Sequence, residues 1–158
     1  MAQEEAEASS APEVSIKFVY ISCNDLDAMR GFYTDLLGMD EWSYRNDDEY
    51  AWLVYNCDGF QFMIFPSDYE LPVPDDWGMQ PGWEGGTLEV PSWSIEVPED
   101  TYAATVAGLA EAGVPTFAAA PQWCQDSYWS FPVRDPMGST VEVYTVPSER
   151  PESTEWPE

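Results

Sequence analysis

Apolar and polar residues alternate along this chain in two patterns, one typical of strands and the other of helices. The segment 16–23 (IKFVYISC) is rich in β-branched and aromatic residues and predicts a strand. Asp25 is suited to the N-cap of a helix over 26–37, whose apolar residues recur at helical spacing before Gly38 ends it. Three more strands are predicted over 39–45, 50–55 and 60–65.

The same order of elements restarts after a long linker. A strand is predicted over 92–97 and a helix over 99–112, followed by strands over 116–119, 128–134 and 139–146. We therefore expect an α+β fold with two βαβββ modules. Their predicted bounds are 15–66 and 92–146, with a linker at 67–91 and disordered acidic tails at 1–14 and 147–158. Trp77 and Trp83 indicate that the linker packs against the folded body.

The predicted strands have one apolar face and one mixed face. In the last strand, Val141 and Val143 alternate with Glu142, whose carboxylate lies on the other side. The apolar faces are expected to lie beneath the helices. The mixed faces carry aromatic, hydroxyl, amide and carboxylate groups, and we expect them to line a cup that binds a ligand. A plainly solvated face is the alternative.

The charge balance excludes several partners. The 158 residues include 30 acidic and 5 basic ones, for a formal net charge of −25. The two tails account for −7 of this charge, so residues 15–146 still carry −18. Nucleic acid and anionic membrane surfaces are not expected partners, because both require clustered Lys and Arg. An apolar fraction of 44% is nevertheless enough for a packed core.

The absence of histidine excludes Ser-His-Asp and Cys-His catalysis, as well as metal sites that need imidazole. Cys23, Cys57 and Cys124 are far apart and form no CxxC pair, so buried reduced thiols are expected. The N-terminal residues lack the basic and apolar regions of a signal peptide, and no apolar run approaches ~18 residues. A cytoplasmic protein with no membrane segment is expected.

Three stretches in this order resemble the vicinal oxygen chelate superfamily, which includes glyoxalase I, bleomycin-resistance proteins and extradiol dioxygenases. The segment CNDLDAMRGFYTDLLGM (23–39) is similar to the superfamily's strand-to-helix signature. LAEAGVP (109–115) is similar to the end of its second helix, and FPVRDPMGSTVEVY (131–144) to the end of its second module. The resemblance implies that the sheets of two modules form a curved eight-stranded cup, within a homodimer.

In enzymes of this superfamily, four cup-facing residues usually hold a divalent metal. The resemblance carries these positions to Phe18, Met63, Ser92 and Glu142. Only Glu142 is suited to a hard divalent ion, and one carboxylate does not anchor such an ion. We therefore expect neither metal nor cofactor, as in the superfamily's metal-free members that sequester drugs.

The leading hypothesis is a metal-free cup that binds a small cationic or aromatic molecule, for example to sequester a drug. The ligand-binding candidates are Phe18, Tyr20, Trp52, Gln61, Met63, Phe65, Ser92, Ser94, Trp123, Trp129 and Tyr144. The alternative is a metal-independent isomerase, lyase or cyclase that uses Glu142 or Glu96 as acid or base. The acidity also has two explanations, attraction of a cationic ligand and adaptation to high salt, and the sequence favours neither.

Overall fold

The computed structural model describes residues 14–82 and 84–157. In the first module, strand β1 is followed by a helix and three antiparallel strands, and β1 pairs in parallel with β4 at the sheet edge. The sheet order is β1-β4-β3-β2. The elements are β1 (Phe18–Cys23), α1 (Leu26–Arg30), the π-helix η1 (Gly31–Leu36), β2 (Glu41–Asn46), β3 (Ala51–Cys57) and β4 (Phe60–Pro66).

The second module repeats this topology, with β5 parallel to β8 and a sheet order of β5-β8-β7-β6. Its elements are β5 (Ser92–Glu96), α2 (Glu99–Glu111), β6 (Gln122–Cys124), β7 (Tyr128–Arg134) and β8 (Thr140–Thr145). The predicted α+β fold of two βαβββ modules is confirmed. No strand of one sheet pairs with a strand of the other within the described ranges, so a single chain presents two separate four-stranded sheets.

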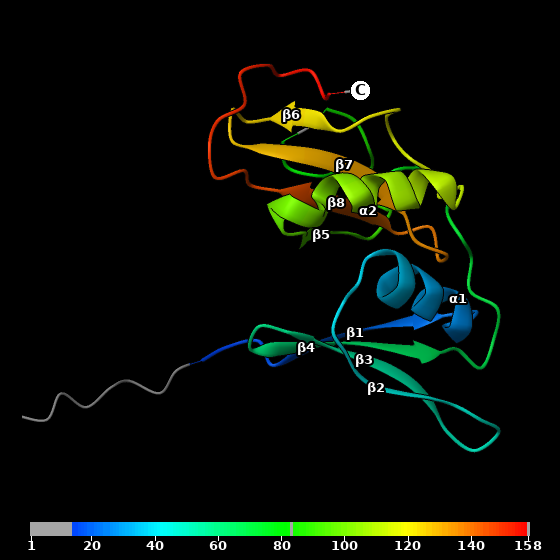
Figure 1. Cartoon of the computed structure of the whole chain (residues 1–158). Helices are drawn as coiled ribbons and strands as arrows, with labels where there is room; N and C mark the ends of the chain where they lie inside the picture. The colour runs from blue at the N-terminus through cyan, green and yellow to red at the C-terminus, as the bar shows by residue number, and fades with distance from the viewer. Residues whose placement is uncertain (1–13, 83, 158) are drawn as a thin grey trace, which may run out of the picture.

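Each sheet has a helix on one face only. In Figure 1, α1 lies between the first sheet and the second module, so the other face of the first sheet points away from the rest of the molecule. Helix α2 lies in front of the second sheet in the same view, and part of the green linker runs behind it. The residues between helices and sheets form one core, which includes Phe32, Phe62, Leu109 and Val143. We call the sheet faces opposite the helices the outer faces.

A buried hydrogen bond joins the two modules within this core. The Tyr33 hydroxyl of η1 donates to Asp135 Oδ2 at 2.8 Å, across 102 residues of sequence. Asp135 also accepts bonds from the backbone N–H groups of Met137 and Ser139 in the turn before β8. Burial raises the pKa of the Asp135 carboxyl, and this effect outweighs the hydrogen bonds that lower it.

The first helix differs from the prediction of one α-helix over 26–37. It changes at Gly31 into the π-helix η1, in which the Leu37 N–H donates to Phe32 O at 3.1 Å. Glycine at this junction has a low α-helical propensity, which makes a change of helix type less costly there. Both Phe32 and Tyr33 of the wider turn are buried in the core.

The strand predicted over 116–119 is also wrong. Only Thr116 forms an isolated bridge, with Val133, and the edge of the second sheet is the three-residue β6. Trp123 of β6 packs edge-on against Trp129 with ring centroids 5.2 Å apart. This aromatic cross-strand pair stabilises β6 rather than the more apolar segment before it.

The C-terminal segment predicted to be disordered lies against the second module over residues 147–157. Trp156 packs edge-on against Tyr102 and Trp129, at centroid distances of 5.5 and 5.0 Å. A single aromatic residue thus anchors an otherwise acidic segment. The N-terminal tail, apart from the exposed Val14, lies outside the described residues. None of the described helices has the length and apolar character needed to cross a membrane.

Candidate functional site

The outer face of the first sheet carries an aromatic hollow of about 490 Å³. Its lining comes from the three strands β2, β3 and β4. The residues that line it are Trp42, Ser43, Trp52, Val54, Met63 and Phe65. Trp42 is 61% exposed, so this aromatic surface is open to a partner or a ligand. None of these six side chains is an acid or a base.

A β-bulge builds one wall of the hollow. The β2–β3 pairing shifts between Glu41 and Ser43, which leaves Trp42 as an extra residue. Strict alternation would place Trp42 on the helix side together with Tyr44, whereas the bulge lets Trp42 and Ser43 both line the hollow. The Trp52 ring N–H donates to Ser43 Oγ at 2.8 Å and fixes the indole ring across the floor. The sequence analysis missed Trp42 and Ser43.

The predicted ligand-binding residues of the first module share this face. Trp52, Met63 and Phe65 line the hollow itself. In the parallel pairing of β1 with β4, Phe18 lies beside Gln61 and Tyr20 beside Met63, which extends the surface toward the sheet edge. Phe18 and Tyr20 are 56% and 66% exposed, a large apolar area for the surface of a monomer.

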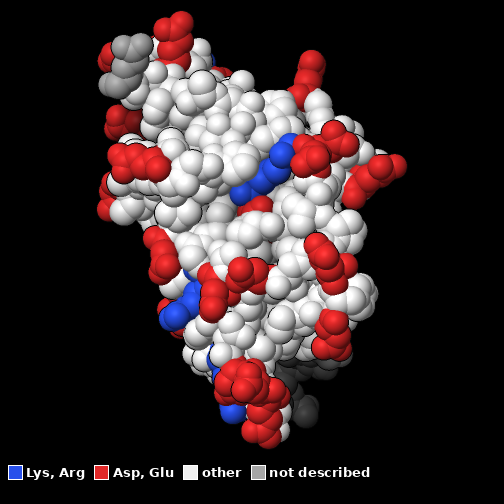
Figure 2. Space-filling view, turned by 90° about the vertical axis from the view of Figure 1, so that its right-hand side faces the viewer, with Lys and Arg blue, Asp and Glu red and all other residues white. Residues whose placement is uncertain are grey.

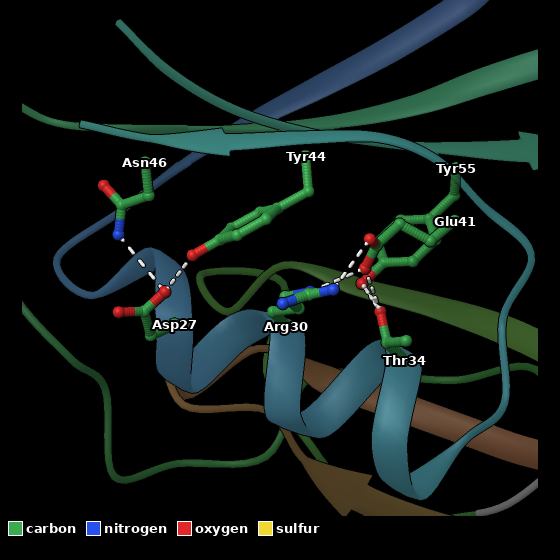
Figure 3. A network of polar contacts seen from close by, with 7 residues as sticks. All are labelled: Asp27, Arg30, Thr34, Glu41, Tyr44, Asn46 and Tyr55. Carbon is green, nitrogen blue, oxygen red and sulfur yellow. Dashed lines mark hydrogen bonds and ion pairs between the residues drawn. The ribbon is translucent and has the colours of Figure 1, made fainter. Parts of the chain in front are cut away.

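A polar network on the helix side holds β2 in place (Figure 3). Arg30 of α1 donates from Nε and Nη2 to the two carboxylate oxygens of Glu41, at 2.8 and 3.0 Å. Thr34 donates to Glu41 at 2.9 Å, and the Arg30 guanidinium lies 4.2 Å above the Tyr44 ring. The bonds from Arg30 and Thr34 lower the pKa of the Glu41 carboxyl. The edge strand β2, which carries Trp42, is therefore bonded on its helix side to Arg30 of α1 and Thr34 of η1.

The outer face of the second sheet is polar, and it is buried around Glu142 and Ser130, whereas Ser94 and Glu96 are exposed. Glu142 of β8 is only 4% exposed, and each of its oxygens accepts a hydroxyl bond of 2.6 Å, from Ser94 and from Ser130. Tyr144 and Tyr128 pack edge-on nearby, at 5.7 Å between ring centroids. Burial and the Glu142 charge raise the pKa of Tyr128 to about 12. Ser92, Ser94 and Tyr144 therefore do share a face with Glu142, as predicted from strand alternation.

The linker covers part of this second face and leaves Ser94 exposed. Gln80 is 4% exposed, and its amide group donates to Ser92 Oγ and to Trp93 O. Trp77 packs edge-on against Phe117 at 5.5 Å, which confirms that the linker packs on the body. Trp83 lies outside the described residues. The sequence analysis missed Gln80, because no local pattern indicates where a linker residue will dock.

Three other candidates lie away from both outer faces or at their margin. Trp129 is in the core on the helix side, and Trp123 packs on it and donates to Asp126, so these positions give no support to a ligand-binding role. Glu96 is exposed and accepts a bond of 3.3 Å from Tyr144. Glu96 lines neither the hollow of the first sheet nor a second hollow that lies between the modules.

The four positions that correspond to the metal ligands of the superfamily's enzymes do not form a ligand set. Phe18 and Met63 offer no oxygen or nitrogen side-chain donor, and they lie on the first sheet, away from the other two. On the second sheet, Ser92 bonds to Gln80, and both Glu142 oxygens are engaged by serine hydroxyls. No cluster of three or more Cys, Asp or Glu residues suited to a metal occurs in the part of the chain that the structure describes. These residues therefore do not provide the ligands for the divalent ion that enzymes of the vicinal oxygen chelate superfamily hold at these positions.

A second hollow, of about 700 Å³, lies between the modules and is visible from the side shown in Figure 2. Arg134 is its basic residue. The guanidinium lies 4.4 Å above the Trp77 ring and donates to the backbone oxygen of Asp75, so the cation already has internal partners. Asp135, which also lines this hollow, accepts the bond from Tyr33 that joins the two modules. Arg134 and Asp135 are therefore both used in holding the structure together.

The cysteines are expected to be poor nucleophiles. Burial raises the pKa of all three thiols, that of Cys23 to about 11. In native protein at neutral pH, a thiol-specific reagent such as DTNB should modify only Cys57 within minutes, since Cys23 and Cys124 are buried. Mass spectrometry of the labelled peptides measures this. Rapid native labelling of Cys23 would contradict the buried position.

Comparisons with known proteins give a family and a fold. A family model described as Glyoxalase/Bleomycin resistance protein/Dioxygenase superfamily matches residues 15–143. A glyoxalase/dioxygenase from Nostoc punctiforme superposes with a TM-score of 0.61 at 18% identity, covering 90% of this chain and 99% of that chain.

Two further solved structures are similar. For lactoylglutathione lyase from Agrobacterium tumefaciens the TM-score is 0.54 at 18% identity, covering 85% of this chain and 96% of that chain. For the oxidase ChaP-H2 it is 0.61 at 17% identity, covering 85% and 94%. None of the curated proteins matches the chain. At these identities the solved structures share the fold with this chain, and the likeness extends no further.

Proposed function

The chain belongs to the glyoxalase/bleomycin resistance protein/dioxygenase superfamily, and on this basis we propose that it binds a small cationic aromatic molecule on the outer face of its first sheet. The observation that carries the proposal is the open hollow between Trp42, Trp52 and Phe65. Sequestration of such a molecule, for example a drug, is the function that this surface supports best.

The chemistry of the hollow suits a flat cation. The face of an indole ring attracts a cation by roughly 0.5–2 kcal/mol, and offset stacking adds to this when the ligand is aromatic. Met63 supplies a polarisable, adaptable wall, and Ser43 places a hydroxyl in the hollow beside the Trp52 ring N–H. The net charge of −25 raises the concentration of cations around the molecule, and the Trp52 ring already has one cation near it, the Arg45 guanidinium at 5.6 Å from the ring centroid.

The enzymatic alternative lacks a supporting observation. None of the six residues that line the hollow has a titratable side chain, so nothing there could act as a general acid or base. Glu142 is buried on the other sheet with both oxygens bonded. Turnover that disappears in Glu142→Gln while ligand binding survives would favour the enzyme.

A thermal-shift screen of cationic aromatic compounds, bleomycins included, followed by isothermal titration calorimetry, tests the proposal. We expect at least one compound of this class to bind with a stoichiometry of one per chain, and neutral or anionic aromatic analogues to bind more weakly. If no cationic aromatic compound binds, the proposal fails.

We also propose that the protein is a homodimer. The segment from Val14 to Tyr20 exposes Val14, Ile16, Phe18, Val19 and Tyr20, of which Val14 and Ile16 are 95% and 71% exposed. Burying this apolar segment against a second copy would remove these side chains from water while leaving the hollow open. Light scattering coupled to size exclusion measures the mass, and a monomer at micromolar concentration would contradict the proposal.

Salt should separate the two explanations of the acidity. Figure 2 shows carboxylates spread over both modules and few basic groups on this side of the molecule. If the charge attracts a cationic ligand, raising KCl from about 0.05 M to about 0.5 M should weaken binding of the compound found above, because the screening length falls below about 10 Å. The thermal denaturation midpoint should change little between about 0.05 M and about 2 M KCl. A sharp loss of stability below molar salt would instead assign the acidity to salt adaptation.

A further inference from the structure

A short piece of the linker, residues 77–82, crosses the outer face of the second sheet, and we call it the strap. Its backbone is bonded to that face at two points. The Gly78 N–H donates to Thr140 Oγ1 at 2.7 Å in a buried bond, and the Tyr128 hydroxyl donates to Pro81 O at 3.2 Å. The strap is thus anchored to both β8 and β7.

The strap also packs too closely to be loosely placed. A Cβ atom on Gly78 would lie 2.9 Å from both Ser92 Cβ and Val90 O, so only glycine fits here without movement. The returning linker holds the strap from its other side, because the Met79 N–H donates to Thr87 O at 3.0 Å and the Thr87 N–H to Trp77 O at 2.8 Å. These contacts give the strap a single position.

Gln80 is the strap residue whose side chain bonds to β5 on the second outer face. Its carboxamide N–H₂ group donates to the Trp93 backbone oxygen at 3.1 Å and to Ser92 Oγ. Ser94, whose hydroxyl donates to Glu142, lies 3.4 Å from the Gln80 carbonyl oxygen. The carboxamide therefore meets the polar groups of the second face as a bound ligand would.

We propose that the strap is a permanent intramolecular occupant of the second outer face, and that this occupancy restricts ligand binding to the first sheet. The occupancy stands on the contacts of the strap alone, whereas the restriction rests on the proposed function. The two outer faces of this duplicated fold are consequently not equivalent. One carries an open aromatic hollow, and the other is crossed by the strap, which leaves Ser94 exposed.

Hydrogen exchange of the ligand-free wild-type protein tests the occupancy. The Gly78 amide should exchange about as slowly as the amides of β8, because its bond to Thr140 breaks only when the second module opens. The exposed amide of Glu70, in the same linker but outside the strap, serves as the fast control. A Gly78 amide that exchanges on the timescale of Glu70 would show that the strap is a mobile lid, and would overturn the proposal.

Binding of the cationic aromatic dye ethidium tests the restriction. Gln80→Ala should keep the wild-type dissociation constant within about twofold, while Trp52→Ala should weaken it at least about tenfold. An equal loss in both variants would place part of the ligand on the second face and overturn the restriction. If wild-type protein binds neither ethidium nor bleomycin, the proposed function fails, whereas the exchange result still decides the occupancy.

Discussion

Replacing Asp135 with alanine is expected to lower the free energy of unfolding by about 3–5 kcal/mol, because it leaves three buried donors without an acceptor. Those donors are the Tyr33 hydroxyl and the N–H groups of Met137 and Ser139, at 2.8, 2.9 and 3.0 Å. The same change removes the bond that joins η1 to the turn before β8. Urea denaturation followed by tryptophan fluorescence measures the loss.

Asp135→Asn is the matched control. Asparagine keeps an oxygen acceptor for the two backbone amides, so its cost should be no more than about 1 kcal/mol. A loss in Asp135→Asn as large as in Asp135→Ala would show that the negative charge, rather than the acceptor geometry, stabilises the fold.

The pH dependence gives the same residue a second test. Because burial raises the pKa of Asp135 in the folded state, the native protein binds its proton more tightly than the unfolded chain does. This contribution is therefore present at low pH and is lost as the pH rises from about 3.8 through the raised native pKa. The free energy of unfolding of Asp135→Asn should lack that decline. The free energy of unfolding of the wild type should therefore rise relative to that of the variant as the pH is lowered. Parallel curves for the two proteins would contradict this.

Replacing Trp52 with alanine is expected to weaken binding of a cationic aromatic ligand by about 30-fold, or about 2 kcal/mol. The substitution removes the central ring of the hollow and leaves the Ser43 hydroxyl without its indole partner. Trp52→Phe should lose less, since it keeps a ring face but not the ring N–H. Calorimetric titration with the compound identified by the screen measures both.

Tyr69→Ala is the control for this experiment. Tyr69 is an aromatic residue that is 73% exposed in the linker, away from the hollow. Its removal should leave the dissociation constant unchanged. If Tyr69→Ala and Trp52→Ala weaken binding equally, the ligand is attracted to exposed aromatics in general and the hollow is not a specific site.

The sequence predicted the regular parts of this fold because duplicated local patterns determine them. Alternation within a strand correctly separated Val141 and Val143 in the core from Glu142 on the outer face. The same rule, applied to β7, would have placed Trp129 in the core with Phe131 and Val133, and so would have removed it from the ligand-binding candidates.

The site itself depends on two features that break local rules. The bulge in β2 turns Trp42 to the outer face, and an extra residue in a strand cannot be seen until the pairing with β3 is known. Gln80 occupies the second face through contacts with β5, although it lies in a segment with no periodic pattern. Both features are tertiary, which is why the sequence predicted a cup that binds a ligand but not that the linker crosses the outer face of the second sheet.

An NMR footprint of ethidium on isotopically labelled protein tests most directly whether the ligand binds on the first sheet. Chemical-shift changes are expected to concentrate at the backbone amides of Ser43, Trp52, Met63 and Phe65, with those of Ser94, Ser130 and Glu142 unchanged. Shifts concentrated on Ser94, Ser130 and Glu142, or along the groove between the modules around Arg134, would contradict the assignment of the ligand to the first sheet.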